Sequence, residues 1–275
     1  MTDGAGTVSI DAKKYGPWAV IAGGSEGIGP CIATHLAKAG INLVLIARKA
    51  EQLKEVAERL RAQSGVEVRT LTLDLTDAAM LDRVRAATDD LDVGLLVYNA
   101  GASHKTGPYI NWALDDAVKV IKLNTLGQAI LAHHFGKRMA ARRKGGIVLM
   151  GSLAGNGGSP SVVPYAGAKA FSQIFSEGLW WEMKEHGVDV LHVVVGSTAT
   201  PAMARLGIVY RQNQAVEPED VARYTLENLA NGPVIVMPEM FERFKQLATP
   251  DRRKATEMNA ALVMGNTKGT WQTTK

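Results

Sequence analysis

Cysteine is nearly absent from the 275-residue chain, which holds only Cys31. A single thiol excludes a disulfide within the chain and a cysteine-rich zinc site, and it fits a reducing compartment. Long apolar runs are absent too, since no stretch approaches the ~18 residues that a membrane-spanning helix needs. The first residues, Met1 to Tyr15, lack the apolar core of a secretory signal. We therefore expect a cytoplasmic protein with no membrane span.

Charge of one sign is also scarce, because 31 Lys and Arg face 27 Asp and Glu, for a net charge of +4. No basic stripe with interleaved aromatic residues appears, so we expect no nucleic-acid partner. The six histidines show no metal-ligand spacing such as H-E-x-x-H, which predicts structural or surface roles and no metal site. His104 has an alternative role, because it follows Asn99-Ala100-Gly101 and could line a substrate cleft.

Seven short apolar runs alternate with amphipathic helical stretches along the rest of the chain. Runs rich in Val, Ile and Leu between such helices are typical of βαβ units, in which both faces of a parallel sheet are covered. The predicted strands are 18–22, 43–46, 68–73, 95–98, 147–150, 190–195 and 234–237. The predicted helices are 28–39, 50–63, 78–87, 166–185 and 218–229, with one long helix or two over 114–143.

This order favours a Rossmann-like α/β fold, a doubly wound parallel sheet of about seven strands with helices on both faces. A closed (β/α)₈ barrel is the alternative. The glycine-rich turn after the first strand and the single irregular insertion near 200–214 favour the open sheet. Residues 1–15 are predicted to be a flexible lead-in, and residues 16–275 a single domain.

The first strand runs into the glycine-rich segment Ala22–Gly29, and a helix follows. Its glycines match G-x-x-x-G-x-G at Gly23, Gly27 and Gly29. Glycine lets a backbone turn sharply and approach a pyrophosphate, and a helix N-terminus offers free N–H groups. The alternative is a plain strand-to-helix turn. The residues expected to contact a dinucleotide here are Gly23, Ser25, Glu26, Gly27, Ile28 and Gly29.

The second strand ends at Ala47, and two cations follow it, Arg48 and Lys49. An NAD site usually offers an acidic side chain here for the ribose 2′-hydroxyl. A carboxylate would repel a 2′-phosphate, whereas Arg48 can bind one through its guanidinium fork. The sequence therefore predicts NADP rather than NAD, the alternative being that both cations are solvated loop charges.

Two further strand ends suit the same cofactor. Asp74 and Leu75 follow the third strand, where the carboxylate can accept from an adenine amino group. Asp74 could instead cap the helix that starts near Asp77. Asn99-Ala100-Gly101 follows the fourth strand, where small residues permit close approach of the cofactor.

Tyr165 and Lys169 are four residues apart near the start of a predicted helix, which puts both on one face. A phenol has a pKa near ~10, too high for a base at neutral pH. A nearby ammonium favours the phenolate and would bring Tyr165 into the range of a general acid/base. Lys169 can also donate to ribose hydroxyls. The spacing alone is common in helices, so the pair needs support from its surroundings.

Ser152 supplies that support at the end of the fifth strand, in Met150-Gly151-Ser152. Doubly wound sheets bind ligands beyond the carboxyl ends of their strands. A serine hydroxyl placed there can donate to a substrate carbonyl as negative charge develops on its oxygen.

Taken together, these motifs resemble the short-chain dehydrogenase/reductase family over roughly residues 16–238. Ser152 stands thirteen residues before Tyr165, the interval usual in the family. The motifs occur in the family's order: Gly23-x-x-x-Gly27-Ile28-Gly29, Asp74, Asn99-Ala100-Gly101, Asn124, Ser152, Tyr165-x-x-x-Lys169 and Thr200.

The resemblance implies a role for each catalytic residue. Tyr165 would be the acid/base, Ser152 would orient the carbonyl, and Lys169 would bind ribose and lower the tyrosine pKa. Asn124 would hold a water in a proton relay to Lys169. Without the resemblance, Asn124 reads only as a helix cap or a solvent-facing polar residue.

The resemblance also implies cofactor contacts at Thr198 and Thr200. It implies that the helix after Tyr165 and the long helix before it pair between subunits of a homodimer or homotetramer. The chain departs from the family at Ala22, Tyr98 and Val195, where Thr, Asn and Pro are usual.

Two segments bear on the substrate. The loop predicted to bind the substrate is residues 201–214. Its apolar content indicates a hydrophobic ketone or secondary alcohol, such as a steroid, acyl chain or polyketide. The alternative is that the loop is a lid packed on the core. The C-terminal extension, residues 239–275, either lines the cleft or packs between subunits. The apolar side chains of the loop, which it carries together with Arg205 and Arg211, are Met203, Leu206, Ile208, Val209 and Tyr210.

The sequence therefore predicts an NADP-dependent oxidoreductase that acts on CH–OH or C=O groups of a small molecule. The alternative is a non-catalytic NADP-binding module that senses redox state. The complete set Asn124, Ser152, Tyr165 and Lys169 argues against it, since a sensor need not keep all four. Another cofactor reaction, such as epimerisation, needs a second acid or base that the sequence does not identify.

Overall fold

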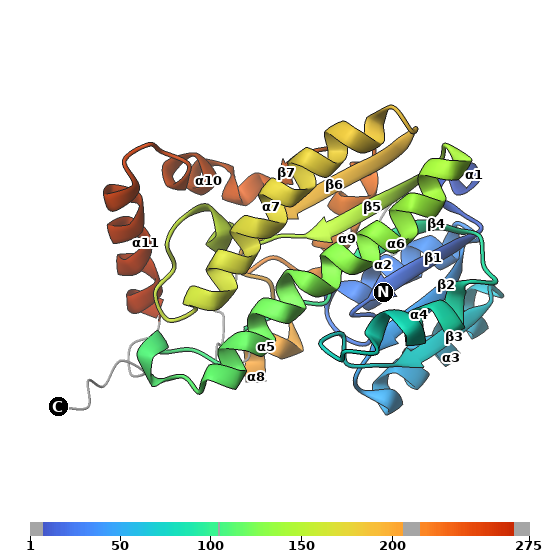
Figure 1. Cartoon of the computed structure of the whole chain (residues 1–275), viewed down its shortest axis with the longest axis horizontal. Helices are drawn as coiled ribbons and strands as arrows, with labels where there is room; N and C mark the ends of the chain where they lie inside the picture. Colours follow the sequence, from blue (N-terminus) through green and yellow to red (C-terminus); the bar gives the residue numbers. More distant parts are fainter. Residues whose placement is uncertain (1–7, 104, 206–214, 267–275) are drawn as a thin grey trace, which may run out of the picture.

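The computed structural model describes residues 8–103, 105–205 and 215–266, with side chains up to residue 261. Within these ranges seven parallel strands form one open sheet in the order β3-β2-β1-β4-β5-β6-β7 (Figure 1). The strands are β1 (Trp18–Ala22), β2 (Asn42–Ala47), β3 (Val68–Thr72), β4 (Val93–Tyr98), β5 (Gly145–Met150), β6 (Val188–Val194) and β7 (Val234–Val236). The predicted doubly wound sheet is confirmed, and a closed barrel is excluded.

Helices cover both faces of the sheet. One face carries α2 (Ile28–Lys38), α3 (Ala50–Ser64) and α9 (Pro218–Glu227). The other carries α4 (Met80–Thr88), α5 (Leu114–Asn124), α6 (Leu126–Arg142) and α7 (Val163–Lys184). The remaining helical segments are α1 (Ala12–Tyr15), η1 (Tyr109–Asn111), η2 (Leu153–Asn156), α8 (Pro201–Arg205), η3 (Pro238–Met240), α10 (Phe241–Leu247) and α11 (Arg252–Asn266).

The alternation of side chains along each strand builds the two cores. Ala19 and Ile21 of β1 enter the core under α2, α3 and α9. Trp18 and Val20 enter the core under the other four helices. Since successive strand residues point to opposite faces, a sheet covered on both sides needs an unbroken apolar run, which β1 supplies.

The sheet reverses its winding between β1 and β4. The chain moves outward from β1 through β2 to β3, then returns to the other side of β1 with β4. The turns that leave β1 and β4 therefore diverge at the carboxyl edge, where such folds bind ligands. The Asn99 Nδ2 donates to the Gly23 carbonyl at 2.9 Å and ties the two turns together.

The stretch 114–143, predicted as one long helix or two, is two helices, α5 and α6, which meet at Thr125 with φ −126° and ψ −71°. Two side chains donate hydrogen bonds to backbone carbonyls at this break. The Tyr98 Oη donates to the Leu123 carbonyl at 2.7 Å, and the Gln128 Nε2 donates to the Asn124 carbonyl at 2.8 Å. Because carbonyls at a helix end need partners, these two donors stabilise the break beside Asn124.

The N-terminal segment differs from the expected flexible lead-in, residues 1–15, within its described part. Val8 and Tyr15 are buried, and residues 12–15 form α1. The Tyr15 Oη donates to Asp189 at 2.5 Å, and Lys14 forms an ion pair with the same carboxylate. Gly146 leaves room for the ring, since an added Cβ there would lie 2.9 Å from Tyr15 Cε1.

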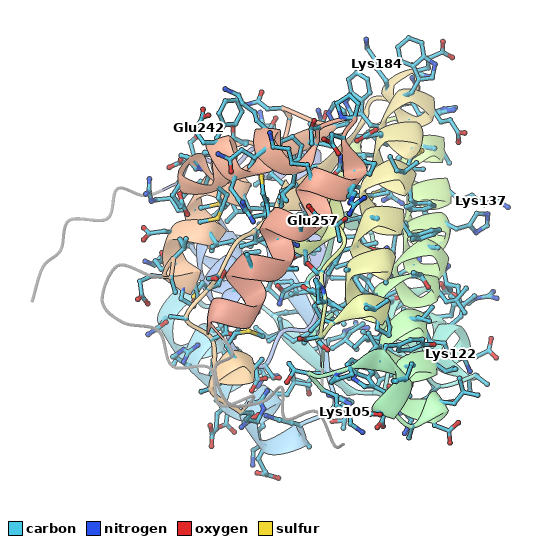
Figure 2. The ribbon with its side chains drawn as sticks, turned by 90° about the vertical axis from the view of Figure 1, so that its left-hand side faces the viewer. Lys105, Lys122, Lys137, Lys184, Glu242 and Glu257 are labelled. Atoms are coloured by element: carbon cyan, nitrogen blue, oxygen red, sulfur yellow. The ribbon has the colours of Figure 1, made fainter. Side chains whose placement is uncertain are left out.

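The C-terminal extension packs on its own chain next to the loop that follows β5. The Asn259 Nδ2 of α11 donates to the Gly158 carbonyl at 3.1 Å and to the Ser159 Oγ at 2.7 Å. The buried Leu247 of α10 faces Gly157. Figure 2 shows α11, marked by Glu257, in front of the loop that leads into α7. No helix in the described ranges is long and apolar enough to cross a membrane.

Candidate active site

Lys169 is the buried centre of the predicted catalytic group. It lies two turns into α7, which begins with Pro164 in its first turn, a favoured place for proline. Its Nζ donates to the Met150 carbonyl at the carboxyl end of β5, at 2.7 Å. The same Nζ lies 5.5 Å from the centre of the Tyr165 ring. The predicted one-turn pairing of Tyr165 and Lys169 is therefore present, and it is anchored to a strand end.

Burial controls the charge of this lysine. Lys169 is 4% exposed, and desolvation lowers its pKa from 10.5 to about 8. A buried ammonium is costly because it loses its hydration. The side chain therefore exchanges its proton much closer to neutral pH than an exposed lysine does.

Asn124 lies beside Lys169 at the end of α5. Its Nδ2 donates to the Val120 carbonyl at 2.8 Å, whereas its buried Oδ1 has no hydrogen-bond partner among the described residues. A Cβ added at Gly101 would overlap that Oδ1 and would lie 3.1 Å from Lys169 Nζ. The turn after β4 thus places Gly101 close to both the Asn124 Oδ1 and the Lys169 Nζ.

Ser152 is placed by the turn that follows β5, two residues after the carbonyl that Lys169 contacts. It is partly exposed, and its Oγ accepts a hydrogen bond from the Ala154 N–H at 3.2 Å. That bond leaves the hydroxyl hydrogen available as a donor, which is the property required at a substrate carbonyl.

A buried polar chain behind the site was missed by sequence reasoning. The Ser172 Oγ donates to the Gln128 Oε1 at 2.9 Å, and Gln128 donates in turn to the Asn124 carbonyl. His192 of β6 lies 3.4 Å from the Ser172 Oγ and faces Gly151. Burial, followed by the nearby Lys169 charge, lowers the His192 pKa to about 3, so the ring is neutral. The only sequence signal was a set of polar residues at buried helix and strand positions.

The glycine turn after β1 has the shape that a dinucleotide needs. Gly23 and Gly27 have φ of +89° and +66°, a region that side chains disfavour. A Cβ at Gly29 would overlap the Gly23 carbonyl. Ile28 begins α2, so its N-terminus faces the carboxyl edge of the sheet. This backbone cradle fits the pyrophosphate expected there.

One of the two cations after β2 contacts a carboxylate of that turn. Arg48 and Lys49 are exposed, and the Lys49 Nζ lies 2.9 Å from the Glu26 Oε2. Arg205 of α8 also binds Glu26, with its Nη1 at 2.9 Å from Oε2 and its Nη2 on Oε1. The hydrogen bond from Arg205, set against burial, lowers the Glu26 pKa. Ser25 is partly buried beside Glu26.

Asp74 forms a local turn rather than the helix cap near Asp77 that was the alternative. Its Oδ1 accepts from the Thr76 N–H at 2.9 Å and from the Thr76 Oγ1 at 2.8 Å. Burial would raise the Asp74 pKa, but the Thr76 bonds outweigh it and the net pKa is lowered. The carboxylate therefore stays ionised at the carboxyl edge, with Leu75 buried beside it.

The residues that follow β6 lie against the glycine turn that follows β1. Thr198 is buried and pairs with Val216 in an isolated bridge. A Cβ at Gly27 would lie 3.1 Å from the Thr200 Cγ2, so Thr200 lies against the glycine turn. His104 and the loop residues 206–214, including Leu206, Ile208, Val209, Tyr210 and Arg211, lie outside the described residues.

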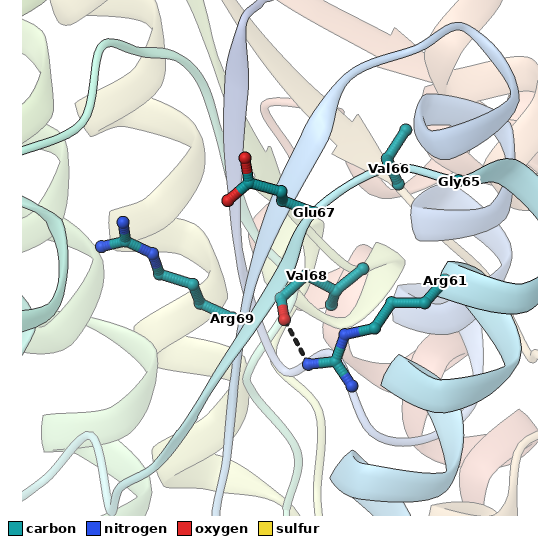
Figure 3. A pocket seen from close by; sticks show the side chains of 6 residues that line it. All are labelled: Arg61, Gly65, Val66, Glu67, Val68 and Arg69. Carbon is teal, nitrogen blue, oxygen red and sulfur yellow. Dashed lines mark hydrogen bonds between the residues drawn. The ribbon is translucent and has the colours of Figure 1, made fainter.

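Two surface pockets lie elsewhere. The first, about 350 Å³, is at the amino end of β3, the edge opposite the glycine turn (Figure 3). Its lining residues are Arg61, Gly65, Val66, Glu67, Val68 and Arg69. The second, about 370 Å³, is lined by Leu81, Arg85, Asp89, His133, His134, Lys137 and Arg138. Across the described ranges, no three His, Cys, Asp or Glu side chains are grouped as a metal site.

The sequence and the fold are similar to those of known proteins. A family model described as short chain dehydrogenase matches residues 17–208. A 7beta-hydroxysteroid dehydrogenase of Clostridium sardiniense is 32% identical over 255 residues, which is 90% of this chain and 92% of that protein. A very-long-chain 3-oxoacyl-CoA reductase of Neurospora crassa is 36% identical over 197 residues, 70% of this chain and 59% of that protein.

A solved structure is similar over most of the chain as well. A short-chain dehydrogenase from Sphingobium yanoikuyae, in complex with NADPH, superposes with a TM-score of 0.77 and 31% identity, covering 84% of this chain and 91% of that one. The chain is an enzyme that acts on hydroxyl or carbonyl groups, and it belongs to the short-chain dehydrogenase/reductase family.

Proposed function

We propose that the chain is an NADP-dependent reductase of a bulky hydrophobic ketone, or the reverse dehydrogenase, with Tyr165 as the acid/base. The placement of Lys169 at the end of β5, one helical turn from Tyr165 and near Asn124, carries this proposal. A buried lysine whose pKa is about 8 is costly to keep, and a purely structural site has no use for it.

Each residue of the group has a defined part in moving the proton. The Tyr165 hydroxyl gives its proton to the carbonyl oxygen during reduction, while Ser152 donates a hydrogen bond to the same oxygen. The Lys169 ammonium stabilises the negative charge left on the Tyr165 oxygen. The bound nicotinamide supplies the hydride. The Asn124 Oδ1, which like the Lys169 Nζ lies close to Gly101, is an acceptor that can hold a water between the lysine and solvent.

The phosphorylated cofactor is favoured by the charges after β2. Arg48 and Lys49 follow the strand where an NAD enzyme commonly carries an acidic residue. Two exposed cations can bind a 2′-phosphate, and Asp74 remains for the adenine amino group. Gly23, Gly27 and Gly29 would hold the pyrophosphate, and Thr198 and Thr200 would lie toward the nicotinamide end.

A bulky apolar substrate is favoured by the segments around the cleft. Met240 packs on Gly196, and Met203 of α8 is partly buried. The extension holds the loop that follows Ser152 from outside. The relative that covers most of the chain is a hydroxysteroid dehydrogenase, and the second acts on a very long acyl chain. A steroid or an acyl chain is therefore the substrate class to test first.

We also propose a homodimer or homotetramer built on α5, α6 and α7. These helices expose large apolar side chains that a monomer would leave in water: Ile121, Leu126, Ile130, Phe171, Ile174 and Trp181. Ile174→Asp should lower the mass measured by light scattering to that of a smaller assembly, whereas a wild-type monomer contradicts the proposal. The cytoplasmic location stays a prediction from the sequence.

The decisive experiment tests the proposed acid/base and the proposed cofactor. Ketones and secondary alcohols are screened with NADPH and NADP⁺, and Tyr165→Phe is compared with Tyr224→Phe, which removes a phenol hydroxyl on α9. We expect Tyr165→Phe to lower kcat by about 10³-fold or more with the NADPH Kd unchanged. Turnover that survives in Tyr165→Phe would contradict the proposed acid/base, and tighter binding of NADH than NADPH would contradict the cofactor.

A further inference from the structure

Glu26 is held by two cations that come from distant parts of the chain. Lys49 follows β2 and contacts the Glu26 Oε2 at 2.9 Å. Arg205 ends α8, 179 residues from Glu26, and contacts both carboxylate oxygens. Such a two-point pair is among the stronger arrangements of an arginine and a carboxylate. Glu26 therefore lies between the glycine turn, the end of β2 and the start of the substrate loop.

Without a cation to neutralise it, the negative charge of the Glu26 carboxylate would disfavour binding of a cofactor that carries a 2′-phosphate. It contacts one of the two cations proposed to bind the 2′-phosphate, and a phosphate monoester carries about −1.5 to −2 charges at pH 7. A carboxylate near the ribose repels that group and is the feature that NAD sites use to bind a free 2′-hydroxyl. Glu26 by itself would thus favour the cofactor without the phosphate.

Arg205 removes the conflict. Its guanidinium occupies both oxygens of Glu26, so Lys49 is not needed to neutralise the carboxylate. With Arg205, two cations contact Glu26; without it, Lys49 alone contacts the carboxylate. Removing Arg205 therefore leaves Lys49 to neutralise Glu26, so that less positive charge is available to a phosphate.

We propose that Arg205 is a specificity-determining residue for the phosphorylated cofactor, which it favours by neutralising Glu26. The proposal rests on the proposed NADP preference. Arg205 acts through Glu26 and Lys49, so it is a positioning residue rather than a catalytic one. A purely structural role, in which the pair only fastens α8 to the glycine turn, would affect both nicotinamide cofactors equally.

The test measures Kd for NADPH and for NADH by the change in nicotinamide fluorescence, which needs no substrate. The variants are Arg205→Gln, Glu26→Gln and the double variant. Arg85→Gln is the matched control, because Arg85 is 54% exposed against 50% for Arg205 and also pairs with a carboxylate, at the opposite edge of the sheet.

Arg205→Gln should weaken NADPH binding by about tenfold, which corresponds to about 1.4 kcal/mol. NADH binding should not weaken, since its free 2′-hydroxyl is a group that a carboxylate near the ribose can bind. The double variant should bind NADPH within about twofold of wild type, because Lys49 then has no Glu26 carboxylate to neutralise. Arg85→Gln should leave both constants unchanged, and raising the salt concentration should shrink the Arg205→Gln effect.

Three results would overturn the role of Arg205: unchanged NADPH binding in Arg205→Gln, equal weakening of both cofactors, or a double variant as weak as the single one. The wild-type protein tests the underlying cofactor proposal separately. A wild type that binds NADH as tightly as NADPH overturns the NADP preference and the Arg205 proposal with it. A wild type that prefers NADPH, with an unaffected Arg205→Gln, overturns the Arg205 proposal alone.

Discussion

Replacing Lys169 by methionine should abolish catalysis and yet make the folded protein more stable at neutral pH. Burial lowers the Lys169 pKa from 10.5 to about 8. One pKa unit is worth about 1.4 kcal/mol, so the charged side chain costs about 3 kcal/mol in the folded state. Methionine carries no charge and has a similar length, but it loses the hydrogen bond to the Met150 carbonyl, worth about 2 kcal/mol because the donor is charged. The expected net gain at pH 7 is about 1 kcal/mol.

The sign of the pH dependence follows from the same shift. Below pH 8 the lysine is protonated in both folded and unfolded states, and the whole penalty is present. Between about pH 8 and 10.5 the unfolded chain binds more protons than the folded one, so wild-type stability rises with pH. The advantage of Lys169→Met should therefore shrink through this window and vanish or reverse near its upper end.

The assay is urea unfolding of both proteins without cofactor, followed by tryptophan fluorescence at pH 7 and pH 10. Comparing the two proteins at each pH cancels groups that they share. Lys54→Met, at a position 67% exposed on α3, is the control and should change stability little at either pH. The destabilisation that we assign to burial of the Lys169 charge is contradicted if Lys169→Met is less stable than wild type at pH 7, or if its advantage in stability does not fall by pH 10.

Three more changes test the turn, the helix break and the extension. Gly29→Ala should weaken NADPH binding more than about tenfold, because its Cβ overlaps the Gly23 carbonyl; unchanged fluorescence titrations would contradict this. Tyr98→Phe removes a buried hydrogen bond to the Leu123 carbonyl and should cost about 1–3 kcal/mol in urea unfolding. Leu247→Ala empties a fully buried position and should cost about 2–5 kcal/mol, with an intact midpoint indicating that the extension unfolds separately.

The strands were predictable because their signal is local. Most of them are short apolar runs, and each predicted strand overlaps an observed one. The Tyr165–Lys169 pairing was also predictable, since helical geometry alone puts residues four apart on one face. The placement of Asn124 near Lys169 came from the family resemblance and not from the residues themselves.

What escaped the sequence depends on contacts between distant segments. The break between α5 and α6 has no proline, and its stability comes from Tyr98 and Gln128, whose side chains reach in from a strand and the next helix. The Glu26–Arg205 pair joins residues 179 apart. No local pattern encodes such partners, because they are decided by how the whole sheet twists and packs.

The hydrogen bond between Tyr15 and Asp189 also has a consequence for the order of folding. It joins residues 174 apart, from the segment before the first strand to the sixth strand. During synthesis this hydrogen bond can therefore form only after most of the chain has left the ribosome. The N-terminal half of the chain can form β1 to β4, but Tyr15 gains its hydrogen-bond partner only after β6 has been synthesised. Loss of the hydrogen bond between Tyr15 and Asp189 should therefore speed unfolding more than it slows folding, as expected for a contact that forms after the transition state.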